Sequence, residues 1–332
     1  MKAMIYRDFG PPEVLHYEDV PEPVPGTGEV AIEVHACSVN RVLDVAVRAG
    51  KQPQRKVQLP HVGGVDPVGI VTAVGPGVTD RKVGDTVAVF QGLGERKMFG
   101  IHCWGGNAQF TKAPVFATCV VPKGVSFADA CVLARHAPVA WNLLVHMGKL
   151  KAGEWVLVMG AAGNLGSIGI QLAKNRGAKV IACAGSEERA RLGRELGADH
   201  TINYKNADLK AEILRITEGK GVNLVYDNIA NPQTTAAAID ALGYDGRLVT
   251  AGAHGGPVVP VNFFHVYDHR ITLMGSPMSR GEDAMPALED AAAGKMRVLV
   301  ERVMPLGQAV AAHRLVESSP ATGKIILDPS LG

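Results

Sequence analysis

The chain has 332 residues, too many for one ordinary hydrophobic core, and this length suits two domains. Hydrophobic residues make up 47% of the chain and charged residues 20%, the composition of a globular protein that folds in water. The net charge of +2 comes without a dominant basic cluster, so we expect neither a nucleic-acid partner nor binding to an anionic membrane surface.

No apolar run is long enough to cross a bilayer, and the first residues lead into a strand pattern without a signal-peptide core. We therefore expect a cytoplasmic protein. The five cysteines are widely separated and form no CxxC pair. This spacing predicts reduced thiols packed in the core and no structural zinc site.

Residues 1 to about 125 have the short strand-like runs and frequent turns of a β-rich domain. Strand-like runs at 30–34, 69–74 and 86–89 are separated by Pro-Gly, Gly-Pro-Gly and Gly-Asp turns. This pattern predicts a small, bent, barrel-like domain.

From about residue 126 the pattern changes to alternating helices and strands. A helical period at 128–147 leads to the apolar run 155–159, which predicts a strand buried on both faces. Further strands are expected at 179–184, 200–203, 224–227, 247–252 and 271–275, with helices at 187–196, 211–217 and 234–242 between them. Six such strands predict a doubly wound parallel sheet, a Rossmann dinucleotide-binding domain over 126–275.

The remaining tail contains an expected helix at 282–294 and a strand-like segment at 323–327. This last strand could return to the first domain, which would then be completed by about 276–332.

The turn after the first Rossmann strand has the sequence Gly-Ala-Ala-Gly-Asn-Leu-Gly, at 160–166. Ala161 and Gly163 let the backbone approach a pyrophosphate, whose charge would meet free amides and the positive end of the helix dipole. Gly166 lets the helix pack closely on the strand. The position between a buried strand and a periodic helix favours a dinucleotide fingerprint.

The end of the second Rossmann strand indicates which dinucleotide is bound. An NAD enzyme usually carries a carboxylate there, but this chain has Ala-Gly-Ser at 184–186. Ser186 and Arg189 would accept a 2′-phosphate, which favours NADPH. In the alternative interpretation Ser186 only caps the next helix and Arg189 is solvated. Glu187 and Glu188 weigh against the phosphate.

Together these features resemble the medium-chain dehydrogenase/reductase superfamily, specifically its zinc-independent, quinone-oxidoreductase-like branch. The resemblance spans nearly the whole chain. It implies a GroES-like catalytic domain formed by both ends of the chain, a Rossmann domain between them, and an active site in the cleft. Its marks are 38–40 with Asp44 and 48–50, then 60–66, 75–78, 83–87, 105–110, the loop 160–166 and 321–324.

Zinc-dependent members of the superfamily carry Gly-His-Glu where this chain has Gly64, Val65 and Asp66. The isopropyl group of Val65 supplies no lone pair, so we expect no catalytic metal. Cys37 stands where such enzymes place a thiolate and is interpreted as a packed thiol. Without a Lewis acid, alcohol oxidation is disfavoured. The resemblance implies instead that hydride passes from NADPH to a quinone or to the β carbon of an α,β-unsaturated carbonyl.

The resemblance also assigns residues to the cofactor, beginning with a pyrophosphate loop. Tyr204 could equally be a surface tyrosine that closes a strand, and Lys324 could simply be solvated. The matches are Ala161, Gly163, Asn164, Leu165 and Gly166 at the pyrophosphate, Ser186 and Arg189 at the 2′-phosphate, Tyr204 near the adenine end, Asn228 at a cofactor contact, Gly252 and Ala253 facing the nicotinamide, and Lys324 in the returning tail.

Three departures concern the substrate. The family's Asn-x-x-Asp spacing is one residue longer here, from Asn40 to Asp44, so the loop must have a different conformation. Ala46 and Val139 stand where related reductases carry a tyrosine and a threonine, and no proton donor is assigned. Asn40 is the best candidate for a side chain that touches substrate or nicotinamide.

The leading hypothesis is thus an NADPH-dependent reductase of quinones or activated alkenes acting on a small-molecule substrate. An alcohol dehydrogenase of the same superfamily and a non-catalytic NADPH-binding protein are the alternatives. The strand at 271–275 would lie at a sheet edge, and the resemblance implies a homodimer paired along it.

Overall fold

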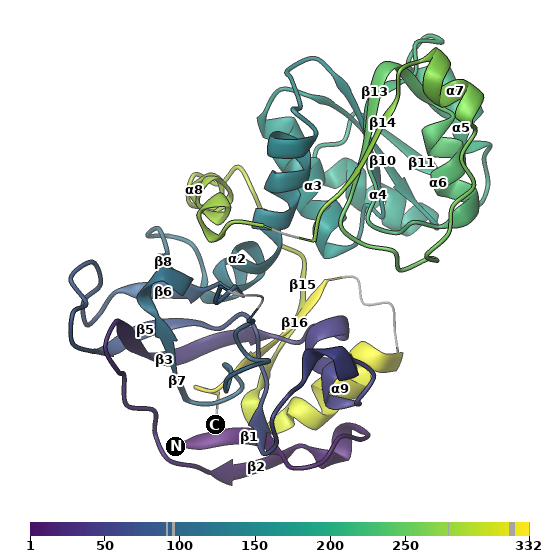
Figure 1. Cartoon of the computed structure of the whole chain (residues 1–332). Coiled ribbons are helices and arrows are strands. Elements are labelled where there is room, and N and C mark those ends of the chain that lie inside the picture. The colour runs from purple at the N-terminus through teal and green to yellow at the C-terminus, as the bar shows by residue number, and fades with distance from the viewer. Residues whose placement is uncertain (91, 95–96, 278, 319–322, 332) are drawn as a thin grey trace. The chain divides into compact units, whose positions relative to one another are not determined.

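The computed structural model describes residues 1–332 except 91, 95–96, 278, 319–322 and 332 (Figure 1). The chain forms two compact units, one made of Met1–Arg135 with Ala284–Gly332 and the other of His136–Asp283. The helix α2 (Phe127–Trp141) begins in the first unit and ends in the second. A continuous helix carries no turn residues to mark such a changeover, so the domain boundaries at 125 and 275 stay predictions.

In the first unit the described residues form a seven-stranded sheet and a three-stranded sheet. The larger sheet has the order β15-β16-β3-β5-β6-β8, with β7 paired to β3 off this path, and the smaller has the order β2-β1-β4. The strands are β1 (Lys2–Tyr6), β2 (His16–Asp19), β3 (Glu29–Ser38), β4 (His61–Val62), β5 (Val68–Val74), β6 (Thr86–Val89), β7 (Phe110–Pro114), β8 (Thr118–Val120), β15 (Val300–Pro305) and β16 (Lys324–Asp328).

The C-terminal tail closes this first unit. Strand β16 pairs antiparallel with β3, where Ile326 lies opposite Ser38 and Leu327 opposite Cys37. The N-terminus of β16 therefore lies beside the C-terminal end of β3, and residues from the two ends of the chain meet there. The helices of this unit are α1 (Ala46–Arg48), α8 (Met285–Ala292) and α9 (Ala309–Ser318).

In the second unit the described strands form one parallel sheet of order β11-β10-β9-β12-β13-β14. Strands β10 and β11 follow one another on one side of β9, and β12, β13 and β14 follow one another on the other side. This order confirms the predicted doubly wound fold. The strands are β9 (Trp155–Met159), β10 (Lys179–Ala184), β11 (His200–Asn203), β12 (Val222–Tyr226), β13 (Leu242–Thr250) and β14 (Thr272–Gly275).

Helices cover both faces of this sheet, with α3 on one side and α5 and α6 on the other (Figure 1). Strand β9 is central, and Val156, Leu157 and Val158 are fully buried, as a strand covered on both faces requires. The helices are α3 (Asn164–Asn175), α4 (Glu187–Glu195), α5 (Leu209–Ile216), α6 (Pro232–Ile239) and α7 (Phe263–Asp268).

Helix starts in the second unit follow local chemistry. Ser186, Asp208, Asn231 and Asn262 each precede a helix, and each side chain accepts a hydrogen bond from a backbone amide of the first turn. The expected helix over 128–147 is shorter than predicted. Helix α2 ends at Trp141, and Asn142–Met147 forms a π-helical turn.

Candidate active site

The loop between β9 and α3 is shaped by its own backbone. The amides of Gly160 and Ala161 both donate to the Cys183 carbonyl, at 2.9 and 3.0 Å, and the Gly163 amide donates to the Gly160 carbonyl at 2.9 Å. Gly160 has a φ of 74°, a conformation that side chains disfavour. A Cβ on Gly166 would lie 2.1 Å from the Gly160 oxygen, so only glycine fits where the helix crosses the loop.

This loop suits a phosphate group. Gly163 is the N-cap residue of the twelve-residue helix α3, and it has no side chain that could cap the first amides. These amides and the positive end of the helix dipole can therefore serve an anion. A Cβ on Gly163 would occupy space that a pyrophosphate would otherwise approach. Asn164 and Leu165, half-buried, form the first turn of the helix.

Three predicted residues lie close together where β10 and β11 end. The Ser186 hydroxyl accepts a hydrogen bond from the Arg189 amide at 3.4 Å, so Ser186 does cap α4. This leaves the hydroxyl hydrogen and a second lone pair for another partner. The Tyr204 hydroxyl lies 2.8 Å from the position of a Cβ on Gly185. Glu187 accepts a hydrogen bond from the Asn203 side chain at 2.8 Å.

The ends of β12 and β13 carry the remaining predicted residues of this unit. The Oδ1 of Asn228 accepts a hydrogen bond from the Ala251 amide at 2.9 Å. Its Nδ2 lies beside the Tyr226 hydroxyl but makes no hydrogen bond of ordinary geometry with the described residues. A carbonyl or amide oxygen of a ligand would satisfy this buried donor. Gly252 accepts a hydrogen bond from the Thr250 hydroxyl at 3.0 Å, and Ala253 is exposed.

In the first unit, Asn40 and Lys324 meet in a buried network. The Lys324 ammonium donates to Oδ1 of Asn40, and Nδ2 of Asn40 donates to Oδ2 of Asp66 at 3.0 Å. Ser38 supports the same carboxylate with its amide at 2.8 Å and its hydroxyl at 2.5 Å. Asn40 is 6% exposed, Asp66 1% and Lys324 4%. Both the oxygen and the nitrogen of the Asn40 side-chain amide are thus bonded to protein groups. It stays a prediction that Asn40 contacts the substrate and that Lys324 contacts the cofactor.

A second carboxylate, Asp44, is buried next to this network. It accepts hydrogen bonds from the amides of Asn40, at 2.8 Å, and Gly64, at 3.0 Å. Burial, and then the charge of Asp66, raises the pKa of Asp44 to about 6. Burial lowers the pKa of Lys324, against the opposing effect of Asp66. Sequence reasoning did not place Asp44 and Asp66 in one cluster, because 22 positions of chain separate them and no local pattern joins them.

The raised pKa of Asp44 predicts how stability depends on pH. Its ordinary value is 3.8, so between about pH 4 and 6 the folded protein binds a proton that the unfolded chain has lost. The contribution of Asp44 to the free energy of unfolding therefore falls as pH rises through this range. In denaturant unfolding at several pH values, the free energy of unfolding of the wild type minus that of Asp44→Asn should fall as the pH rises from about 4 to 6. Equal slopes in the two proteins would contradict this prediction.

The extra residue between Asn40 and Asp44 is absorbed by a π-helical turn. Arg41–Val45 forms this turn, and the Asn40 carbonyl accepts from the amides of both Asp44, at 2.9 Å, and Val45, at 3.0 Å. A π turn takes up one more residue than an α turn, and such turns are frequent at functional sites. The different loop conformation that the longer spacing predicts is therefore this π-helical turn.

The residues at the position of the zinc ligands do not form a complete ligand set. Val65 is fully buried and offers no lone pair. The Cys37 thiol donates to Asp66 at 3.6 Å, and burial raises its pKa well above the ordinary value, so it stays protonated. Across the part of the chain that the structure describes, no three His, Cys, Asp or Glu side chains are grouped so that they could hold a metal ion.

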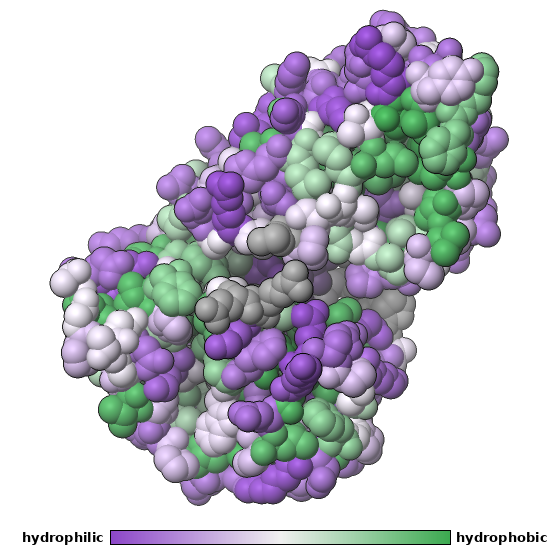
Figure 2. Space-filling model, in the orientation of Figure 1, coloured by the Kyte–Doolittle hydropathy of each residue, from purple (hydrophilic) through white to green (hydrophobic). Residues whose placement is uncertain are grey.

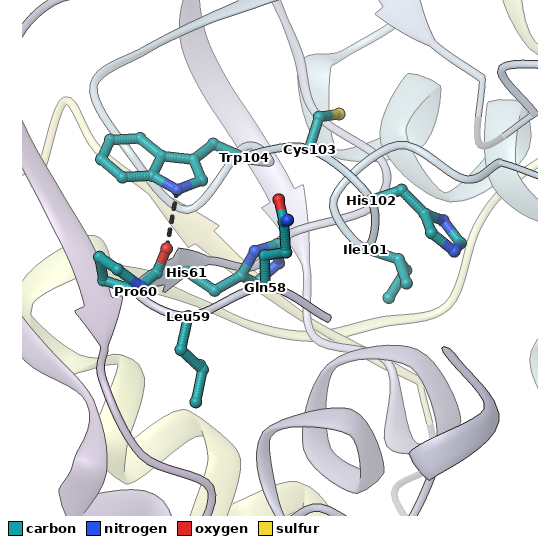
Figure 3. A pocket seen from close by; sticks show the side chains of 8 residues that line it. All are labelled: Gln58, Leu59, Pro60, His61, Ile101, His102, Cys103 and Trp104. Atoms are coloured by element: carbon teal, nitrogen blue, oxygen red, sulfur yellow. Dashed lines mark hydrogen bonds between the residues drawn. The ribbon is translucent and has the colours of Figure 1, made fainter. Parts of the chain in front are cut away.

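Part of the segment 90–104 lines a cavity of about 390 Å³ (Figure 3). Residues 58–61 form the other wall, and the Trp104 indole donates to the Pro60 carbonyl at 3.1 Å. The cavity belongs to the first unit. Residues 91 and 95–96 of this segment, and 321–322 of the tail, lie outside the described residues.

Comparison with protein families matches both units. The alcohol dehydrogenase GroES-like domain matches residues 26–137, and the zinc-binding dehydrogenase family matches residues 165–293. A GroES-like unit joined to a doubly wound parallel sheet with a phosphate loop defines a nicotinamide-dependent oxidoreductase. None of the described helices is both long and apolar enough to span a membrane.

Relatives of similar length narrow this class. The chain is 32% identical to quinone oxidoreductase of Rattus norvegicus, over 98% of this chain and 97% of the relative. It is also 32% identical to 2-haloacrylate reductase of a Burkholderia species, over 99% of each chain. The chain therefore belongs to the medium-chain dehydrogenase/reductase superfamily, in its quinone-oxidoreductase-like branch.

Two solved structures have the same fold over 99% of this chain. An NAD-dependent alcohol dehydrogenase is 35% identical, with a TM-score of 0.88 and 99% of its own chain covered. A mycobacterial protein complexed with NADPH is 31% identical, with a TM-score of 0.80 and 100% of its chain covered.

Proposed function

We propose that this protein is an NADPH-dependent reductase that transfers hydride to a quinone or to an α,β-unsaturated carbonyl compound. The observation that carries the substrate class is buried Val65 beside the protonated thiol of Cys37. An alcohol dehydrogenase of this fold would need metal ligands there to stabilise an alkoxide. An enone or quinone spreads the added charge over its own oxygen, so this task needs only a hydrogen-bond donor. The names of the rat and Burkholderia relatives point to the same chemistry.

When bound, NADPH supplies the hydride, and the residues of the second unit hold and orient it. The glycine loop and the first amides of α3 would take the pyrophosphate. Ser186 and Arg189 would take the 2′-phosphate, and Tyr204 would lie near the adenine. Asn228, Gly252 and Ala253 would contact the nicotinamide end. The mycobacterial structure in complex with NADPH supports this choice of cofactor, whereas the name of the alcohol dehydrogenase neighbour refers to NAD.

The choice between NADPH and NADH should depend on Arg189. Replacing Arg189 with alanine removes a charged partner of the 2′-phosphate, and NADPH affinity should fall about tenfold while NADH affinity is unchanged. Fluorescence titration with both nucleotides measures this. Arg191→Ala is the matched control, because the Arg191 guanidinium lies on the same helix and pairs with Glu195 at 2.8 Å. An equal loss for both nucleotides in Arg189→Ala would contradict the assignment.

The activity itself is tested by stopped-flow loss of NADPH absorbance. The purified protein should oxidise NADPH in the presence of members of a panel of quinones, enals and enoyl thioesters. Tight NADPH binding without turnover of any compound would instead indicate that the protein binds NADPH without catalysing a reaction. An alcohol dehydrogenase remains the alternative within the superfamily. It would be favoured by elemental analysis that finds one zinc ion per chain together with NAD-linked alcohol oxidation.

We further propose that the protein is a homodimer paired along β14. This strand is the edge of the parallel sheet, and its Leu273 is 42% exposed. Hydrophobic residues gather over the region of α7 (Figure 2), where Phe263, Phe264 and Tyr267 are between 65% and 76% exposed. An open strand edge beside such a surface is a ready site for pairing with a second copy.

A charge on this edge should separate the two copies. In a Leu273→Asp dimer, the two-fold axis would bring the two new carboxylates close together. The dimer dissociation constant should therefore rise about tenfold or more. Light scattering over a dilution series measures the mass. Val24→Asp, at a position 79% exposed in the other unit, should leave the dimer intact. A monomeric wild type would rule out the proposed dimer.

A further inference from the structure

A second, much smaller cavity lies inside the first unit. Its volume is about 10 Å³, and it is enclosed by residues from β1, the π-helical turn, α1 and α9. Several of the residues around it are polar, namely Tyr6, Asp44, Arg48, Asn107 and His313. Such a volume matches the space taken by one water molecule and no larger ligand.

Three of the residues that line this cavity carry polar atoms without protein partners. Both ring nitrogens of His313, Oδ1 of Asn107 and Nε of Arg48 are buried and make no hydrogen bond with the described residues. The three side chains are 2%, 3% and 1% exposed. Buried polar atoms that protein groups leave unpaired are usually satisfied by an ordered water. Three such side chains around one cavity are therefore difficult to explain if it is empty.

We infer that this cavity is a binding site for a single structural water molecule. Water both donates and accepts, so it can serve the Asn107 carbonyl oxygen and the ring of His313 together. The Arg48 guanidinium opposes a metal cation, and the Asp44 carboxylate opposes an anion. These charges exclude an ion and the volume excludes a larger molecule, so the ligand that fits is neutral and has one heavy atom.

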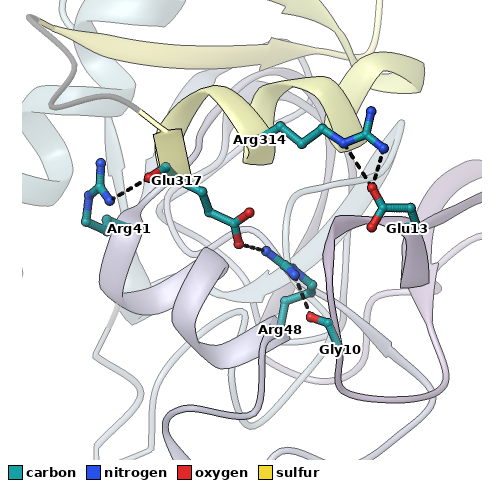
Figure 4. A network of polar contacts seen from close by, with 6 residues as sticks. All are labelled: Gly10, Glu13, Arg41, Arg48, Arg314 and Glu317. Carbon is teal, nitrogen blue, oxygen red and sulfur yellow. Dashed lines mark hydrogen bonds and ion pairs between the residues drawn. The ribbon is translucent and has the colours of Figure 1, made fainter.

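The water joins the C-terminal helix α9 to the segment that follows Asn40. On the outside, α9 is already held by ion pairs from Glu317 to Arg48 and from Arg314 to Glu13, and Arg48 also donates to the Gly10 carbonyl at 2.5 Å (Figure 4). On the inside, the water lies next to Asp44, whose carboxylate holds the amides of Asn40 and Gly64. The site thus supports the loop that carries Asn40.

High-resolution diffraction from crystals of the full chain tests this inference directly. We expect one density peak in the cavity within hydrogen-bond distance of a His313 ring nitrogen and of Asn107. An empty cavity, or a His313 ring bonded to protein groups instead, would overturn the inference.

Magnetic relaxation dispersion of water oxygen gives an independent count of long-lived waters in solution. His313→Phe keeps a ring but removes both nitrogens, and it should lose about one such water per chain. Val316→Ala is the control, because Val316 lies on the same helix, is buried and does not line the cavity. An unchanged count in His313→Phe would refute the site. If this variant does not fold, the diffraction result on the wild type decides.

Discussion

Replacing Lys324 with methionine is expected to lower the free energy of unfolding by about 3 kcal/mol, the lower end of the loss for a directly paired buried charge, because Asn40 lies between the ammonium and the Asp66 carboxylate. Lys324 is 4% exposed and its ammonium is bonded to Asn40, which in turn donates to Asp66. Without this cation, the buried carboxylates of Asp44 and Asp66 would lose the ammonium group at the end of their network. Methionine has a similar length, so the change removes charge with little change in volume.

Denaturant unfolding at pH 8 and at pH 5 measures this effect. The loss should be smaller at pH 5, because Asp44 has a raised pKa of about 6 and can become neutral by taking up a proton. Lys2→Met is the control, since the Lys2–Asp19 pair is exposed and its removal should change stability very little. A Lys324→Met protein as stable as the wild type at both pH values would show that the network does not balance charge as described.

Replacing Gly166 with alanine is expected to weaken NADPH binding about a hundredfold, equivalent to one or two hydrogen bonds to phosphate at about 1.5–3 kcal/mol each. The new Cβ would lie 2.1 Å from the Gly160 oxygen, so the start of α3 must move away from the loop. Because this is an overpacked contact, the free energy of unfolding should also fall by about 1–3 kcal/mol.

Two other glycines separate the effect on binding from the effect on folding. A Cβ on Gly163 would lie 3.3 Å from the Gly160 oxygen, a much milder contact than at Gly166, so Gly163→Ala should lose less stability than Gly166→Ala and still lose affinity. A Cβ on Gly275 would make only ordinary contacts at 3.7 Å, and Gly275→Ala should retain both properties. Nucleotide titration and thermal unfolding of the three variants measure the series. Normal NADPH binding by Gly166→Ala would contradict the phosphate loop.

The second unit could be predicted well because its signals are local. Strands such as β9, β10 and β12 are short apolar runs, and the starts of α4, α5 and α6 are marked by the capping residues Ser186, Asp208 and Asn231. The phosphate loop occupies consecutive positions between two such elements. Strand order then follows from alternation of strands and helices, since few topologies satisfy the right-handed crossover.

The network in the first unit could not be predicted in the same way. Asn40 and Lys324 are 284 positions apart, and they meet only because β16 pairs with the end of β3. The family resemblance singled out both residues but gave no reason to expect a contact between them. The π-helical turn at Arg41–Val45 shows the same limit, because the one-residue change in spacing signals a different loop without specifying its backbone.

We expect this chain to pass hydride from NADPH to an activated alkene or quinone without a bound metal. The test uses NADPH with deuterium at both C4 positions of the nicotinamide, chelator-treated protein, and mass spectrometry of the reduced enone. The label should appear at the β carbon of the product, and the treated protein should retain its full rate. An unlabelled product, or activity that is lost with the chelator and restored by zinc, would contradict it.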